Sequence, residues 1–125
     1  MRRVFAVVAV LGLFALGFPV MAQEAVKADP RHYKVEFEND QIRVLRINYG
    51  AHEKSVMHEH PASFAIFLTD GHIKFTMPDG KTADEMVKAG TTRWDAGGKH
   101  LPENLGDKPL ELVLVELKGK MTPPK

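Results

Sequence analysis

The chain has 125 residues and a mass of 14.0 kDa, which is enough for one domain. Its 17 lysines and arginines nearly balance its 16 acidic residues, and it has no cysteine. Without a basic excess the chain lacks the charge to follow a phosphate backbone, so we exclude nucleic acid as a partner. Without cysteine it cannot be held together by disulfides.

The N-terminal 22 residues have the pattern of a secretory signal peptide. Arg2 and Arg3 precede an uncharged apolar run, Val4 to Val20, and small or branched residues lead up to Ala22. A retained membrane anchor is the alternative, because about 18 apolar residues can also cross a bilayer. The pattern favours cleavage after Ala22, so we expect a periplasmic or secreted protein with no stable membrane anchor. The mature part keeps 15 basic and 16 acidic side chains.

Residues 23–32 are polar, and we interpret them as a tether or lead-in segment. From Tyr33 onward, apolar and polar residues alternate with the period of a β-strand. A change of phase between Val44 and Leu45 predicts a bulge, or a strand buried on both faces. The predicted strands cover residues 33–38, 42–49, 56–60, 64–68, 73–77, 82–87, 91–95 and 110–117.

Turn signals separate these short strands at intervals of roughly 8–12 residues, which is typical of a β-sandwich or barrel. We therefore predict one all-β domain over residues 33–118, followed by a flexible tail at 119–125. The strongly apolar strand Leu110–Leu117 could also mediate homodimerisation.

The main chemical signal is His58-Glu59-His60. Residues two apart on a strand face the same way, so both imidazoles point to one side and Glu59 to the other. Alone, the pair is a weak signal, since about 0.3 such pairs are expected by chance among six histidines. A third histidine, His100, follows the Gly97-Gly98 turn.

Two stretches carrying these histidines resemble the cupin motifs. The first is Gly50-x7-His58-x-His60-x3-Phe64-x6-Gly71, against G-x5-HxH-x3,4-E-x6-G in the family. The second is Gly90-x4-Asp95-x-Gly97-x2-His100-x3-Asn104, against G-x5-PxG-x2-H-x3-N. The resemblance covers both motifs and the hairpin between them, and it implies a small RmlC-like jelly-roll, the double-stranded β-helix barrel.

The chain departs from the family pattern at three places. Gly50 lies two residues too far from His58, unless His52 occupies the glycine position, and Asp95 replaces the proline. Phe64 stands where the family places its glutamate ligand.

The resemblance therefore implies three metal ligands, His58, His60 and His100, without the fourth. Three neutral ligands leave open positions on one divalent metal ion. Fe²⁺ is our first candidate, and Zn²⁺, Cu²⁺, Ni²⁺ or Mn²⁺ are alternatives.

Three further residues are candidates for the pocket. Strand parity places Phe64 on the side of the two histidines, Trp94 is either core or pocket lining, and Asn104 completes the second motif. We interpret the remaining polar candidates as surface groups, with Arg46 and Arg93 able to bind a substrate carboxylate if they face inward. The surface set is His32, His52, His72, Glu59 and Glu103.

Two functions follow from this site. Some cupins with three histidines are iron-dependent dioxygenases, which implies oxygenation of a small organic molecule. The alternative is a non-catalytic barrel that binds a metal or small ligand for storage, sensing or delivery. A polar histidine cluster without metal is the third interpretation.

Overall fold

The computed structural model describes residues 23–119, which form nine strands and one short helix. The predicted signal peptide and residues 120–125 of the predicted tail lie outside this range. Within the described residues, no helix has the length and apolar character needed to cross a membrane. The elements in chain order are α1 (Ala25–Ala28), β1 (Tyr33–Glu38), β2 (Ile42–Tyr49), β3 (His58–His60), β4 (Ser63–Phe67), β5 (Gly71–Thr76), β6 (Thr82–Val87), β7 (Thr92–Asp95), β8 (Gly98–Asn104) and β9 (Leu110–Leu117).

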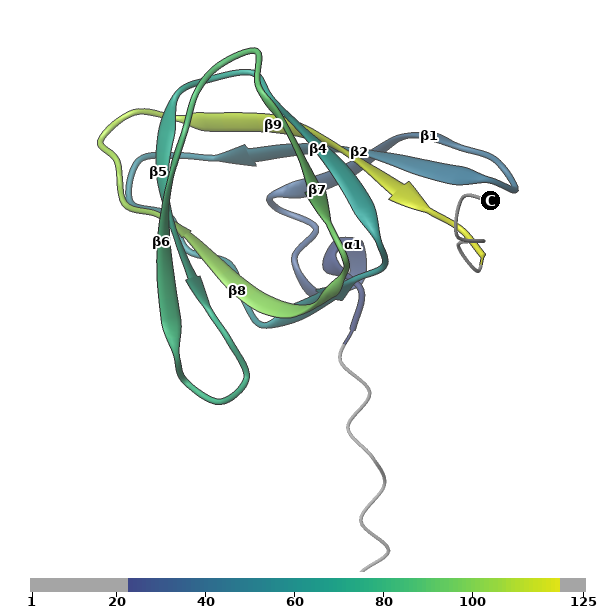
Figure 1. The fold of residues 1–125 in the computed structure, drawn as a ribbon, viewed down its shortest axis with the longest axis horizontal. Helices are drawn as coiled ribbons and strands as arrows, with labels where there is room; N and C mark the ends of the chain where they lie inside the picture. The colour runs from purple at the N-terminus through teal and green to yellow at the C-terminus, as the bar shows by residue number, and fades with distance from the viewer. Residues whose placement is uncertain (1–22, 120–125) are drawn as a thin grey trace, which may run out of the picture.

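The strands form a two-sheet barrel (Figure 1). One sheet has the order β1-β2-β9-β4-β7 and the other β3-β8-β5-β6, and all named pairs are antiparallel. The chain passes from one sheet to the other between β2 and β3, between β3 and β4, and again further on. This alternation is the jelly-roll arrangement, so the predicted all-β class is confirmed.

The sequence pattern missed one strand, β8 (Gly98–Asn104). Its residues are largely polar and include Pro102, which normally argues against an interior strand because it cannot donate to the ladder. Pro102 nevertheless pairs with Phe75 in β5, and its carbonyl accepts a hydrogen bond from Ser55 N at 3.0 Å. Tertiary pairing on both sides therefore makes a strand from a sequence that does not look like one.

β2 itself has no bulge at Val44 and Leu45, because it pairs with β9 without interruption. The second predicted alternative fits better: Val44 is half-buried on one face of the strand, whereas Leu45 is buried on the other. A bulge does lie opposite this point, at Glu36 in β1, where the register shifts between Val35 and Phe37.

The interpretation of residues 23–32 as a tether is wrong. The segment contains α1, whose Ala25 is completely buried, and Gln23 accepts a hydrogen bond from the backbone of Glu59 at 3.0 Å. His32 is also buried, although the sequence analysis placed it on the surface. Small and hydrogen-bonding side chains allow this polar segment to close the barrel beside β3.

Candidate metal centre

The three predicted histidines meet inside the barrel, from two neighbouring strands. His58 and His60 are the two buried residues of β3, and His58 lies directly opposite His100 on β8. The ring centroids are 4.7 Å apart for His58–His60, 4.9 Å for His58–His100 and 5.2 Å for His60–His100. One nitrogen of each ring lies within 4.8 Å of the others, which defines a candidate three-histidine metal site.

A glycine brings the two strands into this register. Gly97 has a φ of +91°, and a Cβ there would lie 2.8 Å from the backbone oxygen of His60. Asp95 accepts a hydrogen bond from Gly97 N at 2.7 Å, which holds the turn before β8. Only glycine satisfies both the backbone angle and the close approach, so this position couples the β7–β8 turn to the end of β3.

Hydrogen bonds on the outer nitrogens fix the rings of His58 and His60. His58 Nδ1 donates to the carbonyl of Val56 at 2.8 Å, and His60 Nδ1 donates to Glu116 Oε2 at 2.7 Å. The Nε2 atoms of the two rings are then left facing each other at 3.0 Å. This is the usual arrangement of metal-binding histidines, in which a hydrogen bond selects the nitrogen left free for the metal.

Glu116 is the residue behind His60 that the motif analysis missed. It is 1% exposed, and Arg43 Nε donates to its other oxygen at 2.7 Å. Burial alone would raise the pKa of Glu116, but the hydrogen bonds from His60 and Arg43 lower it below its usual value. Its charged carboxylate therefore orients His60. A signal was present, because Glu116 is an acidic residue at an inward position of the apolar strand β9.

A second chain of hydrogen bonds lies behind His58. Ser55 Oγ lies 3.3 Å from His58 Nδ1 and donates to Asp29 Oδ2 at 2.6 Å. His32 Nδ1 bonds the same Asp29 oxygen at 2.6 Å, and its Nε2 bonds Glu53. The predicted surface residue His32 is thus part of a buried polar network that supports the site.

His100 is held in a different way. Its ring stacks on Phe75 with centroids 5.2 Å apart and planes 26° apart. Its Nε2 is buried, and no described residue offers it a hydrogen bond. Burial, and then the neighbouring histidines, lower its pKa to about 3, while burial and His60 lower the pKa of His58 to about 4. Both rings are therefore neutral at neutral pH, the form that binds metals.

These residues fit a divalent transition metal. A buried nitrogen without a partner and two facing Nε2 atoms are costly unless a ligand satisfies them. Neutral imidazoles suit zinc, copper, iron and nickel, and three of them leave positions open.

The side chain at the family's glutamate position does not point into the site. Phe64 is 39% exposed, and its neighbours Ser63 and Ala65 are the inward residues of β4. The prediction that Phe64 lies near the metal is therefore wrong. The alternation of inward and outward side chains in β3 does not continue into β4, because the chain passes through Pro61 into the other sheet.

Neither Trp94 nor Asn104, the other two pocket candidates, lines the cavity beside the three histidines. Trp94 pairs with Phe64 on the outer side of the sheet and is 46% exposed, although it borders a shallow pocket at the barrel mouth. Asn104 is buried, and its amide donates to the carbonyls of Gly50 and Lys108 at 3.0 and 2.8 Å. Asn104 therefore holds the loops beside β8 together and does not border the cavity beside the triad.

Most of the remaining candidates lie on the surface, as predicted. Glu59 is exposed, Glu103 pairs with Lys74 at 2.9 Å, and His72 pairs with Asp84 at 3.1 Å.

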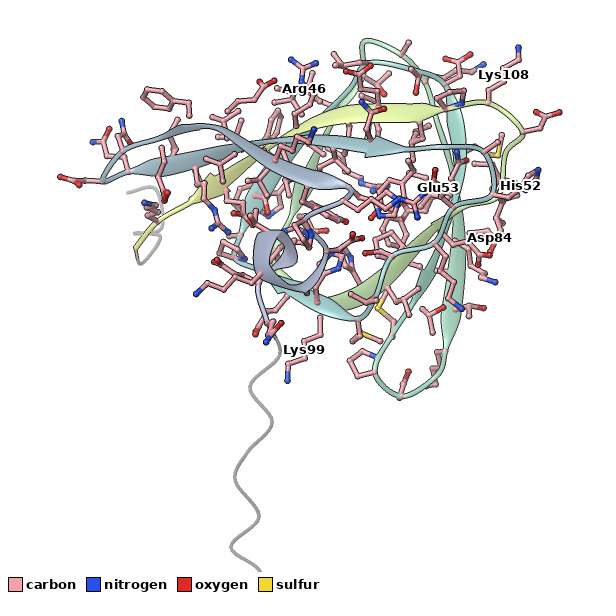
Figure 2. The ribbon with its side chains drawn as sticks, turned by 180° about the vertical axis from the view of Figure 1, so that it is seen from behind. Arg46, His52, Glu53, Asp84, Lys99 and Lys108 are labelled. Atoms are coloured by element: carbon pink, nitrogen blue, oxygen red, sulfur yellow. The ribbon has the colours of Figure 1, made fainter. Side chains whose placement is uncertain are left out.

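His52 lies in the loop that precedes β3, and its exposed side chain points outward (Figure 2). Its φ of +59° is the left-handed conformation that the motif glycine would supply, so His52 occupies that position.

A small cavity of about 60 Å³ lies beside the triad. It is bordered by His60 and His100 at one end and by Arg93 and Asp95 near β7. Its walls are otherwise mainly apolar, and include Ala65, Phe67, Ile73, Leu110, Leu112 and Leu114. Two of the three candidate ligands, His60 and His100, therefore border a mainly apolar chamber.

Comparison with known proteins agrees with this architecture. No protein-family model and no curated protein matches the sequence. Among solved structures, a cupin domain from Bordetella pertussis is similar, with a TM-score of 0.64 and 19% identity over 70% of this chain and 92% of that one. An RmlC-like cupin family protein from Methanocaldococcus jannaschii has a TM-score of 0.55 and 19% identity over 72% and 84%. A protein from Klebsiella pneumoniae with a double-stranded β-helix domain has a TM-score of 0.54 and 20% identity over 70% and 84%.

The described part of the chain therefore has the cupin fold, the RmlC-like double-stranded β-helix. The fold implied by the two sequence motifs is confirmed. Inside it, the three motif histidines form a group that could bind a metal ion.

Proposed function

We propose that this protein is an exported cupin that binds one divalent transition metal through His58, His60 and His100. The observation that carries the proposal is the buried, unpartnered Nε2 of His100 beside the facing Nε2 atoms of the other two rings. Hydrogen bonds donated by His58 to the Val56 carbonyl and by His60 to Glu116 hold the two β3 rings in that orientation before a metal arrives. Pre-oriented ligands favour tight binding, because little freedom is lost when the metal binds.

Oxygenation of a small organic molecule is the first candidate for the chemistry. A bound Fe²⁺ would supply the redox reaction with dioxygen. The protein would exclude water with the apolar walls of the cavity and orient the substrate beside the three rings. The absence of a carboxylate among the predicted ligands leaves the metal with its full double charge, which favours an anionic group at the open positions.

A non-catalytic role in metal or ligand binding is the second candidate. It is favoured by the few carboxylates near the three rings: among the described residues, Asp95 is the one acidic side chain that borders the cavity, and one of its oxygens accepts from Gly97 N. A turnover assay separates the two candidates, because a binding protein returns its ligand unchanged.

The first test is elemental analysis of the mature protein, purified from the periplasm without chelators or a histidine tag. We expect about one metal ion per chain, and near-complete loss in His58→Ala, His60→Ala and His100→Ala. His72→Ala is the matched control, since His72 lies outside the cluster and pairs with Asp84. Unchanged metal content in the three variants would overturn the proposal, and recovery of the protein from the cytoplasm alone would overturn export.

A further inference from the structure

The two arginines singled out in the sequence lie on opposite faces of the same sheet. Arg46 points outward (Figure 2), where it donates to Glu36 at 2.8 Å and to Glu111 at 3.1 Å. Arg93 lies on β7 opposite Ala65, and Ala65 in turn pairs with Leu114. Both of these neighbours are buried core residues, so Arg93 belongs to the inward row of the sheet.

Arg93 places a cation at the wall of the apolar cavity. Its guanidinium carbon lies 5.4 Å from the centre of the Phe67 ring and 5.7 Å from that of Phe75. Arg93 and His100 both border the inner cavity and also a second, more open pocket. The charge of Arg93 therefore lies beside the same two hollows as the His100 ring.

The guanidinium retains donors for a ligand. Its Nη1 pairs with Glu85, whose side chain is 38% exposed. A guanidinium has five N–H donors in a planar fork, and a single carboxylate uses two of them. The rings of Phe67 and Phe75 support the charge without hydrogen-bonding to it, so the remaining donors can bind a second carboxylate.

We propose that Arg93 binds the carboxylate of a small organic acid whose other end lies beside the three histidines. The inference rests on the proposed metal site and names the substrate class of that site. Arg93 is a cation at the wall of a mainly apolar chamber, and its one ion pair within the described part of the chain, with Glu85, leaves other N–H donors unused. Its planar fork matches a carboxylate, and the apolar walls match a short hydrocarbon chain.

The cavity also limits the size of the acid. About 60 Å³ is less than half of the roughly 150 Å³ that holds benzene in a protein interior. Propionate, with a carboxylate and a two-carbon chain, is therefore a suitable probe. Propionamide is its neutral counterpart of nearly the same shape.

The experiment measures binding of propionate and propionamide to the zinc-loaded protein by NMR of the arginine Nε–H groups. We expect propionate to shift the Arg93 signal and to bind at least about 10-fold more tightly than propionamide. Arg93→Gln should weaken propionate binding about 10- to 100-fold while leaving the zinc content unchanged. Arg46→Gln is the matched control, and it should bind propionate as the wild type does.

Equal binding of the two probes, or propionate binding that survives Arg93→Gln, would overturn the assignment of Arg93. Failure of the wild type to bind propionate would do the same. Failure to take up zinc would instead overturn the proposed metal site. In that case propionate is titrated into the metal-free protein, which still tests Arg93. A shift of the Arg93 signal that is absent in Arg93→Gln would support the assignment, and no shift in the wild type would overturn it.

Discussion

The β3 and β8 sides of the histidine cluster are built differently. On β3, hydrogen bonds to Val56 and Glu116 fix the rings of His58 and His60. On β8, His100 is held by stacking on Phe75, and its buried Nε2 has no partner among the described residues. Hydrogen bonds fix both the angle of a ring and its tautomer, whereas stacking fixes only its plane. The β3 histidines therefore form a rigid half of the site, and His100 is the ligand with more freedom to adjust.

The largest expected effect comes from Glu116→Gln, which breaks the rigid half. A glutamine has one acceptor oxygen, so it can accept from His60 or from Arg43 but not from both, and it carries no charge to balance Arg43. One buried donor therefore loses its partner. We expect the free energy of unfolding to fall by about 3 kcal/mol and zinc affinity to fall about 10- to 100-fold. Urea denaturation and a zinc titration against a competing chelator measure the two effects.

The matched control is Glu111→Gln on the outward face of the same strand, where the ion pair with Arg46 is partly exposed. This change should alter stability by less than about 1 kcal/mol. Equal effects of the two substitutions would show that Glu116 contributes no more than a surface charge.

The stability of the metal-free protein at acid pH tests whether His58 is buried in its neutral form. Burial, and then the neighbouring His60, lower its pKa from 6.5 to about 4. Between these values the unfolded chain binds a proton that the folded chain does not. The contribution of His58 should therefore be complete above pH 6.5 and fall by on the order of 3 kcal/mol as the pH falls toward 4. His100, whose pKa is also lowered, adds to the loss over the same range.

Denaturation at a series of pH values checks this dependence. His58→Gln, which is neutral throughout, should flatten the slope, whereas His72→Gln on the surface should not. A slope that persists unchanged in His58→Gln would assign it to other groups.

Phe75→Leu weakens the support of His100, and it leaves the hydrogen bonds of the two β3 histidines in place. Loss of the stacked ring should cost about 1 kcal/mol of stability and change zinc affinity less than Glu116→Gln does. Zinc titration and thermal denaturation measure these effects, with Phe37→Leu, which is 52% exposed, as the control. An affinity loss as large as that of Glu116→Gln would mean that packing orients His100 as strictly as hydrogen bonds orient His60.

The smallest expected effect lies in the loop before β3. His52 has a φ of +59°, which costs a non-glycine residue about 1–2 kcal/mol. His52→Gly relieves this strain but adds freedom to the unfolded chain, so we expect a net stabilisation of about 0.5 kcal/mol, measured by thermal denaturation. Destabilisation would show that the His52 side chain contributes to the loop.

Local patterns in the sequence predicted much of the barrel. Four predicted strands have the bounds that the structure shows, residues 33–38, 42–49, 82–87 and 110–117, and the two cupin motifs contain the three clustered histidines. β8 was missed because its polar residues and Pro102 are accommodated only by pairing with β3 and β5. The direction of Phe64 was wrong because alternation holds within one strand and is lost where the chain changes sheets.

By itself, the sequence determined the strand rhythm and the all-β class, and its resemblance to the cupin motifs indicated the candidate ligands. The strand rhythm and the class depend on neighbours within a few positions, where alternation and turn chemistry operate. Only the tertiary structure decided that Glu116 lies behind His60, that His32 is buried, and that Arg93 faces the cavity while Arg46 faces outward. Such relations depend on which strands pair and where the chain changes sheets, and these are set by burial of the whole core rather than by any local segment.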